Sequence, residues 1–349
     1  MSSTAKLRVA VIGTGILGSR HARVFAEQSD CELVAVADLN PDRAEQVAQS
    51  HGARAFSDYA AMLKTVDVEA IAVATPDHLH CAPVVAALQA GKHVFMEKPL
   101  ATTAQDARDI AAAATAATSA ANTITMVNYS QRYVTDNVWI KQAIASGELG
   151  KPSFILSVKF DTRSVPTGMI ASWAAQTSPI YFMSSHDLDL VHWFLGADPV
   201  EVFAHEVRGT LDAHGQPVHD GLNALIRFED GVSANFHSSW IHPNTYPRIA
   251  DGTLQIIGSE GALTYNARTR TAELFNARGG QEVKFSGPHT ADIVDGKITG
   301  AFTASLRHFV ECCRAGSEPT TSPRRVLATA EAQAAAMQAL SSGQPVRLK

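Results

Sequence analysis

The sequence contains few cysteines and no long hydrophobic run. Only four of its 349 residues are cysteine, and no pair has the Cys-x-x-Cys spacing of redox and zinc motifs. Such a low count is typical of a reducing compartment, and we expect a cytoplasmic location. No apolar run approaches the ~18 residues of a membrane span. The amino-terminal apolar stretch is short and leads directly into glycines, which predicts a first strand rather than a signal peptide.

The chain also has no excess of positive charge. Its 29 Lys and Arg residues are outnumbered by 34 Asp and Glu residues, and the formal net charge is −5. Because nucleic acids and anionic membranes bind basic surfaces, we expect neither as a partner. Hydrophobic residues at 46% and charged residues at 18% are ordinary proportions for a globular protein. The length predicts two domains, since a single hydrophobic core rarely serves so many residues.

Residues 1–125 alternate short apolar runs with helical patterns. The apolar runs are "LRVAVIG", "CELVAVAD", "AIAVATP" and "HVFMEKP". Strands separated by helical segments of roughly 10–15 residues predict a parallel, doubly wound sheet, that is, an α/β domain of the Rossmann type. Residues 126–349 instead contain period-2 stretches such as "SFILSVKF" and "NALIRF", several of them separated by turn signals. This pattern predicts an α+β second domain with a largely antiparallel sheet.

A glycine-rich motif follows the first predicted strand. The sequence "GTGILG" at residues 13–18 matches G-x-G-x-x-G and stands between an apolar run and a helical pattern. In dinucleotide-binding loops the first glycine permits a tight turn, the second lets the backbone approach a pyrophosphate, and the third lets helix and strand pack closely. A plain strand–turn–helix connection is the alternative. The predicted cofactor-binding residues of this loop are Gly13, Gly15, Ile16, Leu17 and Gly18.

Asp38 closes the second predicted strand, 20 residues after Gly18. An acid at this position accepts hydrogen bonds from the ribose hydroxyls of the adenosine half of the cofactor. The same charge repels a 2′-phosphate, so the sequence favours NAD over NADP. Arg43 lies nearby in the chain and keeps NADP possible.

Lys98 belongs to "EKP" at residues 97–99, at the end of the fourth predicted strand. Ligands of open α/β sheets bind beyond the carboxyl ends of the strands, where the nicotinamide half of a dinucleotide would extend. A lysine there can donate a hydrogen bond to a substrate hydroxyl. A solvated lysine at a strand end is the alternative interpretation.

Five segments, spread over nearly the whole chain, occur in the same order in one known family. They are "VAVIGTGILGSRHARVF", "VATPDHLHCAPVVAALQAGKHVFMEKPLA", "SGELGKP", "HDLDLVHWFLG" and "LQIIGSEGAL". With them the chain resembles the glucose–fructose oxidoreductase / inositol dehydrogenase family (Gfo/Idh/MocA). The resemblance implies a Rossmann domain, a second domain with a large, mostly antiparallel sheet, and NAD(P)-dependent chemistry on sugars, polyols and related compounds. It also marks Lys98 as the active-site lysine and places Thr75, His80 and Glu97 beside the cofactor.

The segment "SSHDLDLVHWFLG" predicts a helix that carries a candidate general base. Ser184 and Ser185 are suitable N-cap residues, and Gly196 ends the pattern. His186 therefore lies at a helix amino terminus, where the dipole disfavours imidazolium and favours a neutral ring. From the residues alone, a structural histidine that bonds its neighbours is the alternative. The resemblance implies that His186 is the catalytic histidine.

One position departs from the family pattern. Most dehydrogenases of the family carry an aspartate four residues before the catalytic histidine, whereas this chain has Phe182. The carboxylate that would orient the substrate is therefore absent at this position. Tyr181, Asp161 or Asp187 could replace it, and the sequence does not place any of them.

Polar and aromatic residues of the second domain are candidates for sugar binding, because sugars favour aromatic faces and polar forks. The resemblance implies that Arg132 lines the active-site cleft, and for each of the others a purely structural role is the alternative. We predict no metal site, since His78 and His80 have no third ligand nearby. The candidate substrate-binding residues are Arg132, Arg163, Trp173, Tyr181 and His242.

Together these features predict an NAD(P)-dependent oxidoreductase that transfers hydride between nicotinamide and a secondary alcohol or ketone of a sugar, cyclitol or sugar derivative. His186 would take the hydroxyl proton, and Lys98 would polarise the oxygen. Two alternatives stay open: a lyase or glycosidase that uses NAD transiently, and a non-catalytic dinucleotide-binding regulator. The resemblance also implies a homodimer or homotetramer, because in the family a second subunit commonly buries one face of the large sheet.

Overall fold

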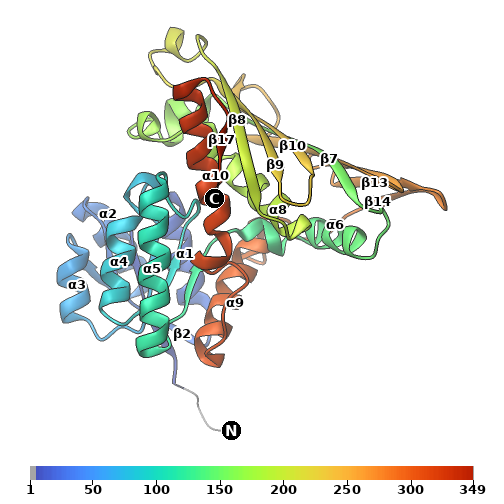
Figure 1. The fold of residues 1–349 in the computed structure, drawn as a ribbon. Helices are drawn as coiled ribbons and strands as arrows, with labels where there is room; N and C mark the ends of the chain where they lie inside the picture. Colours follow the sequence, from blue (N-terminus) through green and yellow to red (C-terminus); the bar gives the residue numbers. More distant parts are fainter. Residues whose placement is uncertain (1–4, 349) are drawn as a thin grey trace. The chain divides into compact units, whose positions relative to one another are not determined.

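The chain forms two units, each built around its own sheet, in a computed structural model that describes residues 5–348 (Figure 1). Unit 1 contains the residues up to Ala101, Gln105–Ser130 and Thr290–Leu327. Unit 2 contains Thr102–Ala104, Gln131–His289 and the residues from Ala328 onward. The sequence predicted a single boundary, after residue 125. It did not predict that Thr290–Leu327 returns to unit 1.

Unit 1 is a doubly wound α/β sheet. Its six strands are all parallel and lie in the order β3-β2-β1-β4-β5-β6, so the strand order reverses direction between β1 and β4. The strands are β1 (Leu7–Ile12), β2 (Cys31–Ala37), β3 (Arg54–Phe56), β4 (Ala70–Val73), β5 (His93–Met96) and β6 (Thr125–Val127). The helices are α1 (Ile16–Glu27), α2 (Pro41–His51), α3 (Tyr59–Thr65), α4 (Cys81–Gln89), α5 (Ala104–Ala121) and α9 (Ala301–Ala315). All four residues of β4 are buried, as in a strand covered on both faces.

The ends of α2 follow from its local sequence. The Asn40 side chain caps the helix by accepting a hydrogen bond from the backbone N–H of Arg43 at 3.1 Å, and Pro41 occupies the first helical position. Gly52 ends the helix in the left-handed region, at a φ of +71°. Strand β2 ends at Ala37 and α2 begins at Pro41. Asp38, which directly follows the strand, therefore lies at the carboxyl edge of the sheet.

The returning segment completes the core of unit 1. It contains the hairpin of β15 (Asp292–Val294) and β16 (Lys297–Thr299), followed by α9, which packs beside α1 and against β5. The ring of Phe309 on α9 lies 5.4 Å from that of Phe95 on β5, measured between centroids. Phe302 stacks on His21 of α1 at 4.9 Å. Apolar packing of α9 is thus the reason that this late segment belongs to unit 1.

Unit 2 contains a nine-stranded mixed sheet in the order β14-β13-β12-β11-β7-β10-β9-β8-β17. Its pairs are antiparallel except for β7 with β10. The strands are β7 (Pro152–Thr162), β8 (Pro199–Val207), β9 (Gly221–Phe228), β10 (Ser233–His242), β11 (Ala250–Gly258), β12 (Gly261–Asn266), β13 (Thr271–Asn276), β14 (Gly279–Lys284) and β17 (Val346–Arg347). The helices are α6 (Thr135–Ala145), α7 (Pro179–Phe182), α8 (Ser184–Leu195) and α10 (Pro323–Ser342), whose first residues belong to unit 1. The predicted fold class is confirmed.

One face of this sheet packs on helices to form the core of unit 2. Burial alternates along β9, with Leu222, Ala224, Ile226 and Phe228 buried and the residues between them exposed. Helix α8 contributes Leu188, Val191 and Phe194 to the same cluster. The period-2 pattern therefore sorts core-facing from outward-facing residues, as expected for an antiparallel sheet. Within the described part of the chain, no helix combines the length and the hydropathy needed to cross a membrane.

Candidate functional site

The glycine loop joins β1 to α1 at the carboxyl edge of the parallel sheet. A Cβ atom on Gly13, whose φ is +87°, would lie 2.6 Å from the carbonyl oxygen of Ala74. One on Gly18 would lie 1.7 Å from the carbonyl oxygen of Gly13. Close packing therefore restricts both positions to glycine. A Cβ atom on Gly15, in contrast, would meet no atom of the chain within 4 Å, apart from its immediate neighbours.

The open space at Gly15 suits the pyrophosphate of a dinucleotide. Gly15 is the N-cap residue of α1, where no side chain caps the helix and the first turn carries no acidic residue. The N–H groups of this turn are thus left for an anionic group. Ile16 is exposed and Leu17 is half-buried at the start of the helix. The loop residues present fit the cofactor that the motif predicts.

Asp38 fastens the glycine loop to the end of β2. Its Oδ2 accepts hydrogen bonds from the N–H and Oγ1 of Thr14 at 2.7 and 3.0 Å. Its Oδ1 accepts from the N–H of Asn40 at 2.8 Å and from Arg43 at 2.9 Å. Burial by itself raises the pKa of Asp38, but these hydrogen bonds outweigh it and hold the pKa below its ordinary value. A fixed negative charge therefore stands at the position predicted to recognise ribose.

The ends of two neighbouring strands, β4 and β5, are joined by the buried imidazole of His80. Its Nδ1 lies 2.9 Å from the carbonyl oxygen of Pro99, and its Nε2 lies 3.1 Å from that of Thr75. Burial lowers the pKa of His80 below its ordinary value, although the charge of Asp77 and the two carbonyls oppose this shift. His80 and Thr75, two of the residues predicted beside the cofactor, thus lie together at the strand ends that also carry Lys98.

The buried carboxylate of Glu97 lies at the end of β5. Its Oε1 is 2.7 Å from Nε2 of His21 and accepts a hydrogen bond from Nδ2 of Asn128 at 2.8 Å. Its Oε2 accepts from the backbone N–H of Lys98 at 3.3 Å. Burial raises the pKa of Glu97, but the contacts with His21 and Asn128 and the charge of Lys98 hold it below its ordinary value. Glu97 is therefore an ionised group bonded to the backbone that carries the predicted catalytic lysine.

Two members of this arrangement lie outside the set of residues predicted from the sequence. Asn128 follows β6, so the rule that ligands gather beyond strand carboxyl ends would have indicated it if this three-residue strand had been recognised. His21 lies on α1, three residues after Gly18, and nothing in its local pattern separates it from an ordinary helix residue.

In unit 2, His186 lies in the first turn of α8, which begins at Ser184. The predicted capping by Ser184 or Ser185 is wrong, because Met183 is the N-cap residue and no side chain caps this helix. Three residues later, Asp189 accepts two hydrogen bonds from the guanidinium of Arg132, at 2.8 and 2.7 Å. Both side chains of this pair are buried. These bonds of Arg132 hold the helix that carries His186. The substrate contact of Arg132 stays a prediction.

Phe182, at the position of the expected aspartate, belongs to an aromatic cluster. Its ring centroid lies 6.1 Å from those of Trp173 and Trp240. Trp240 is fully buried, and these residues belong to or pack against one apolar group of unit 2. An apolar wall thus replaces a carboxylate at this point, and Trp173 contributes to that wall.

Of the groups considered as replacements for the missing acid, Asp187 pairs with a lysine. Its Oδ1 lies 3.4 Å from Nζ of Lys159 on β7. Burial raises the pKa of Asp187, and the charge of Lys159 offsets this only in part. Tyr181 and Asp161 are both buried in unit 2. Asp187, which directly follows His186, is thus a half-buried carboxylate at the start of α8, paired with Lys159.

The two remaining substrate candidates have partners within unit 2. His242 ends β10 and stacks on Tyr246 at 4.4 Å between ring centroids. Arg163 follows β7, and its guanidinium lies 2.6 Å from Nε2 of His214. Their roles in substrate binding stay predictions.

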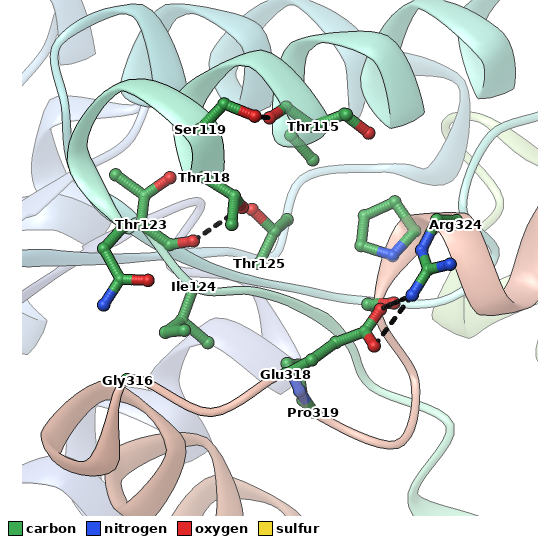
Figure 2. A pocket seen from close by; sticks show the side chains of 14 residues that line it. Thr115, Thr118, Ser119, Thr123, Ile124, Thr125, Gly316, Glu318, Pro319 and Arg324 are labelled. Carbon is green, nitrogen blue, oxygen red and sulfur yellow. Dashed lines mark hydrogen bonds and ion pairs between the residues drawn. The ribbon is translucent and has the colours of Figure 1, made fainter.

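A cavity of about 350 Å³ lies in unit 1, at the amino-terminal edge of its sheet, which is opposite the edge that carries the glycine loop (Figure 2). The last turns of α5, the start of β6 and the segment after α9 line it. The hydroxyls of Thr115, Thr118 and Ser119 donate to backbone carbonyls, and Glu318 pairs with Arg324. The cavity contains none of the predicted site residues, and its polar groups serve mainly the protein's own structure.

Two family models match consecutive parts of the chain. Residues 7–126 match the oxidoreductase family with an NAD-binding Rossmann fold, and residues 138–264 match the GFO/IDH/MocA C-terminal domain. An NAD(+)-dependent scyllo-inositol 2-dehydrogenase from Bacillus subtilis is 27% identical over 98% of this chain and 96% of its own length. An inositol 2-dehydrogenase from Saccharopolyspora erythraea is 28% identical over 98% of this chain and 96% of its own.

Solved structures share the fold over the full length. An oxidoreductase from Agrobacterium radiobacter, in complex with NAD+, L-tartaric acid and magnesium, has a TM-score of 0.85 at 20% identity and covers 98% of both chains. A myo-inositol 2-dehydrogenase from Lactobacillus plantarum has a TM-score of 0.81 at 22% identity, over 99% of this chain and 100% of its own. The two family matches together span most of the chain in the expected order, and the fold agrees. The chain belongs to the Gfo/Idh/MocA family of oxidoreductases, with an NAD-binding Rossmann fold.

Proposed function

We propose that this protein is an NAD-dependent dehydrogenase or reductase acting on a secondary alcohol, or the corresponding ketone, of a cyclitol, sugar or sugar derivative. The observation that carries the proposal is the likeness to the scyllo-inositol dehydrogenase of Bacillus subtilis, which extends over nearly the whole of both chains. The glycine loop and Asp38 supply a site that suits the cofactor. When bound, NAD supplies the hydride acceptor.

Lys98 and His186 are the catalytic residues of this proposal. The ammonium of Lys98 donates a hydrogen bond to the substrate oxygen and stabilises the negative charge that develops there as the hydroxyl proton leaves, before hydride transfer turns the oxygen into a carbonyl. The imidazole of His186, at a helix amino terminus, accepts the hydroxyl proton. In the reverse direction His186 returns the proton to the carbonyl oxygen, while Lys98 donates a hydrogen bond to it.

Asp38 favours NAD over NADP in this proposal. Its ionised carboxylate accepts hydrogen bonds from ribose hydroxyls and repels a 2′-phosphate. Arg43 donates to Asp38 at 2.9 Å and partly neutralises this charge, which leaves NADP as a weaker alternative. The ratio of dissociation constants for NADH and NADPH, from fluorescence titration, measures the preference.

The decisive experiment follows NADH absorbance at 340 nm over a panel of cyclitols, polyols and sugars. Lys98→Met should lower kcat by about 10²–10³-fold, the usual effect of removing one donor that stabilises developing negative charge. It should bind NAD as the wild type does. Lys92→Met, at the amino end of the same strand, is the matched control and should keep full activity. Equal turnover in both variants would exclude Lys98 as a catalytic residue.

A dinucleotide-binding regulator is the second candidate, and the aromatic wall around Phe182 favours it because an orienting carboxylate is missing there. A regulator binds NAD, and neither wild type nor Lys98→Met turns over any substrate. A lyase or glycosidase that uses NAD transiently instead yields product without net NADH. Product analysis alongside the absorbance assay separates these three outcomes.

We also propose a homodimer or homotetramer formed through the outer face of the unit 2 sheet. Phe154, Ile257 and Phe275 are large and apolar, yet 61%, 51% and 57% exposed. Phe154 pairs with Ile257, and Ala262 pairs with both Ile257 and Phe275, so the three form one continuous row. Contiguous exposed apolar surface of this kind typically marks a protein interface.

Sedimentation velocity tests this interface. Ile257→Lys should shift the protein to monomer at micromolar concentration, because it would bury an unpaired charge in the contact. Ile293→Lys, at an exposed apolar residue of unit 1, is the control and should leave the assembly intact. An Ile257→Lys variant that sediments as the wild type does would contradict the proposed interface.

The low cysteine content supports a cytoplasmic location. Cell fractionation with antibody detection measures this directly.

A further inference from the structure

A chain of four buried side chains leads from α9 to the backbone of Lys98. The hydroxyl of Ser305 donates to Oδ1 of Asn128 at 2.6 Å, and Nδ2 of Asn128 donates to Oε1 of Glu97 at 2.8 Å. Nε2 of His21 lies 2.7 Å from the same Oε1. Ser305 and His21 are fully buried, and Asn128 and Glu97 are at most 5% exposed. Ser305 is separated from Asn128 by 177 positions in the chain.

The Glu97 carboxylate and the Ser305 hydroxyl together hold the Asn128 amide in one orientation. An amide carries an acceptor at one end and two donors at the other. Because an ionised carboxylate only accepts hydrogen bonds, the NH₂ end faces Glu97, and Ser305 donates to the oxygen at the other end. The reversed amide would place its oxygen against a carboxylate, and two acceptors repel each other at that distance. Removing the Ser305 hydroxyl therefore weakens the orientation that lets Asn128 bond to Glu97.

The protein also holds the His21 ring in one plane and one tautomer. The ring stacks on Phe302 at 4.9 Å and meets Phe95 edge-on at 5.3 Å, both between centroids. An ionised carboxylate only accepts hydrogen bonds, so the proton of this contact lies on Nε2 of His21. Oε1 of Glu97 thus receives two donors, and Oε2 is left to accept the N–H of Lys98.

We infer that His21, Asn128 and Ser305 are positioning residues that fix the Glu97 carboxylate and, through its bond to the backbone, the place of Lys98. This inference rests on the catalytic role proposed for Lys98. Two of the three touch the carboxylate, and Ser305 acts through Asn128. Helix α9, which carries Ser305, therefore contributes through Asn128 to the geometry of the strand end that carries the lysine.

The test uses the full-length protein with Ser305→Ala and Asn128→Asp. Each variant is measured for kcat, for KM, for the pH dependence of kcat, and for the rate at which acetic anhydride modifies Lys98, followed by mass spectrometry. Thr303→Ala is the matched control. It removes another hydroxyl of α9, which bonds to the backbone of Ile298 at 2.8 Å and lies outside the four-residue chain.

We expect Ser305→Ala to lower kcat about tenfold with little change in the KM for NAD, because the amide loses its orienting donor while the glycine loop is untouched. Asn128→Asp places a second carboxylate beside Glu97, and two such groups share one proton. Its acid limb in the kcat profile should move to higher pH than in the wild type. The acetylation rate of Lys98 should change at least threefold in both variants and stay at the wild-type value in Thr303→Ala.

The acetylation readout needs no turnover, so it separates this inference from the proposed function. If the wild type oxidises no substrate, the proposed function fails while the acetylation rates still decide the positioning role. Wild-type acetylation rates in both folded variants would overturn the inference. Should Asn128→Asp fail to fold, as judged by its thermal transition, the comparison of Ser305→Ala with Thr303→Ala decides alone.

Discussion

Replacing Asp38 by asparagine should destabilise unit 1 by an amount that can be derived from its contacts. The carboxylate accepts four hydrogen bonds, two on each oxygen, and two of the donors are the backbone N–H groups of Thr14 and Asn40. An amide can accept at only one end, so its NH₂ group must face one of these N–H groups. One backbone donor, either the buried N–H of Thr14 or the part-buried N–H of Asn40, is then left without its partner, at a cost of about 1–3 kcal/mol.

The effect should depend on pH in a defined direction. In the folded chain the pKa of Asp38 lies below its ordinary value of 3.8, so the carboxylate stabilises the folded state above that value. This contribution is lost as the pH falls through the folded-state pKa. Since asparagine does not titrate, the difference in free energy of unfolding between wild type and Asp38→Asn should shrink on going from about pH 5 to pH 3.

Urea unfolding monitored by circular dichroism, at several pH values, measures both quantities. Asp42→Asn is the control, because it makes the same charge change at an exposed position of α2 only four residues away. Surface substitutions of this kind usually change stability by less than about 0.5 kcal/mol. A difference for Asp38→Asn that is equally small at pH 7, or that stays constant down to pH 3, would refute the reasoning.

Two further substitutions probe the close packing and the buried charges. Gly13→Ala should abolish NAD binding, measured by fluorescence titration, because its Cβ atom would lie 2.6 Å from the Ala74 carbonyl oxygen, whereas Gly52→Ala, at an open helix end, should retain it. In unit 2, Asp136→Ala should lower the free energy of unfolding by about 1–3 kcal/mol, because the buried Tyr265 hydroxyl loses its acceptor at 2.8 Å and the half-buried Arg270 guanidinium loses its carboxylate at 2.7 and 3.0 Å. A loss under 1 kcal/mol in urea unfolding would show that Arg270 finds another partner.

Local sequence patterns predicted most of the elements that form the cofactor edge of unit 1. The runs that contain β1, β2, β4 and β5 are short and mostly apolar, which is the signature of strands covered on both faces. The glycine motif depends only on neighbours within a few residues, and the packing at Gly13 and Gly18 confirms why those positions are glycine. Strand β3, with three residues, is too short to produce a recognisable pattern.

Contacts between distant segments could not be predicted in the same way. The bond between Ser305 and Asn128 joins residues 177 positions apart, and no periodicity records it. The same holds for the pairing of Arg132 with Asp189 and of Asp187 with Lys159. Sequence patterns report which face of an element is apolar, whereas the choice of polar partner depends on how whole elements pack. The sequence therefore predicts which residues form the site better than it predicts the contacts that those residues make.

The return of α9 to unit 1 affects how unit 1 can fold while the chain is being synthesised. The strands of the cofactor-binding sheet leave the ribosome first, but Phe302 and Phe309, which cover His21 and Phe95, are translated after nearly all of unit 2. Until then an apolar face of the nascent sheet stays open to chaperones or to aggregation. A protein shortened to its first 130 residues would keep the glycine motif and yet lack one wall of its own core.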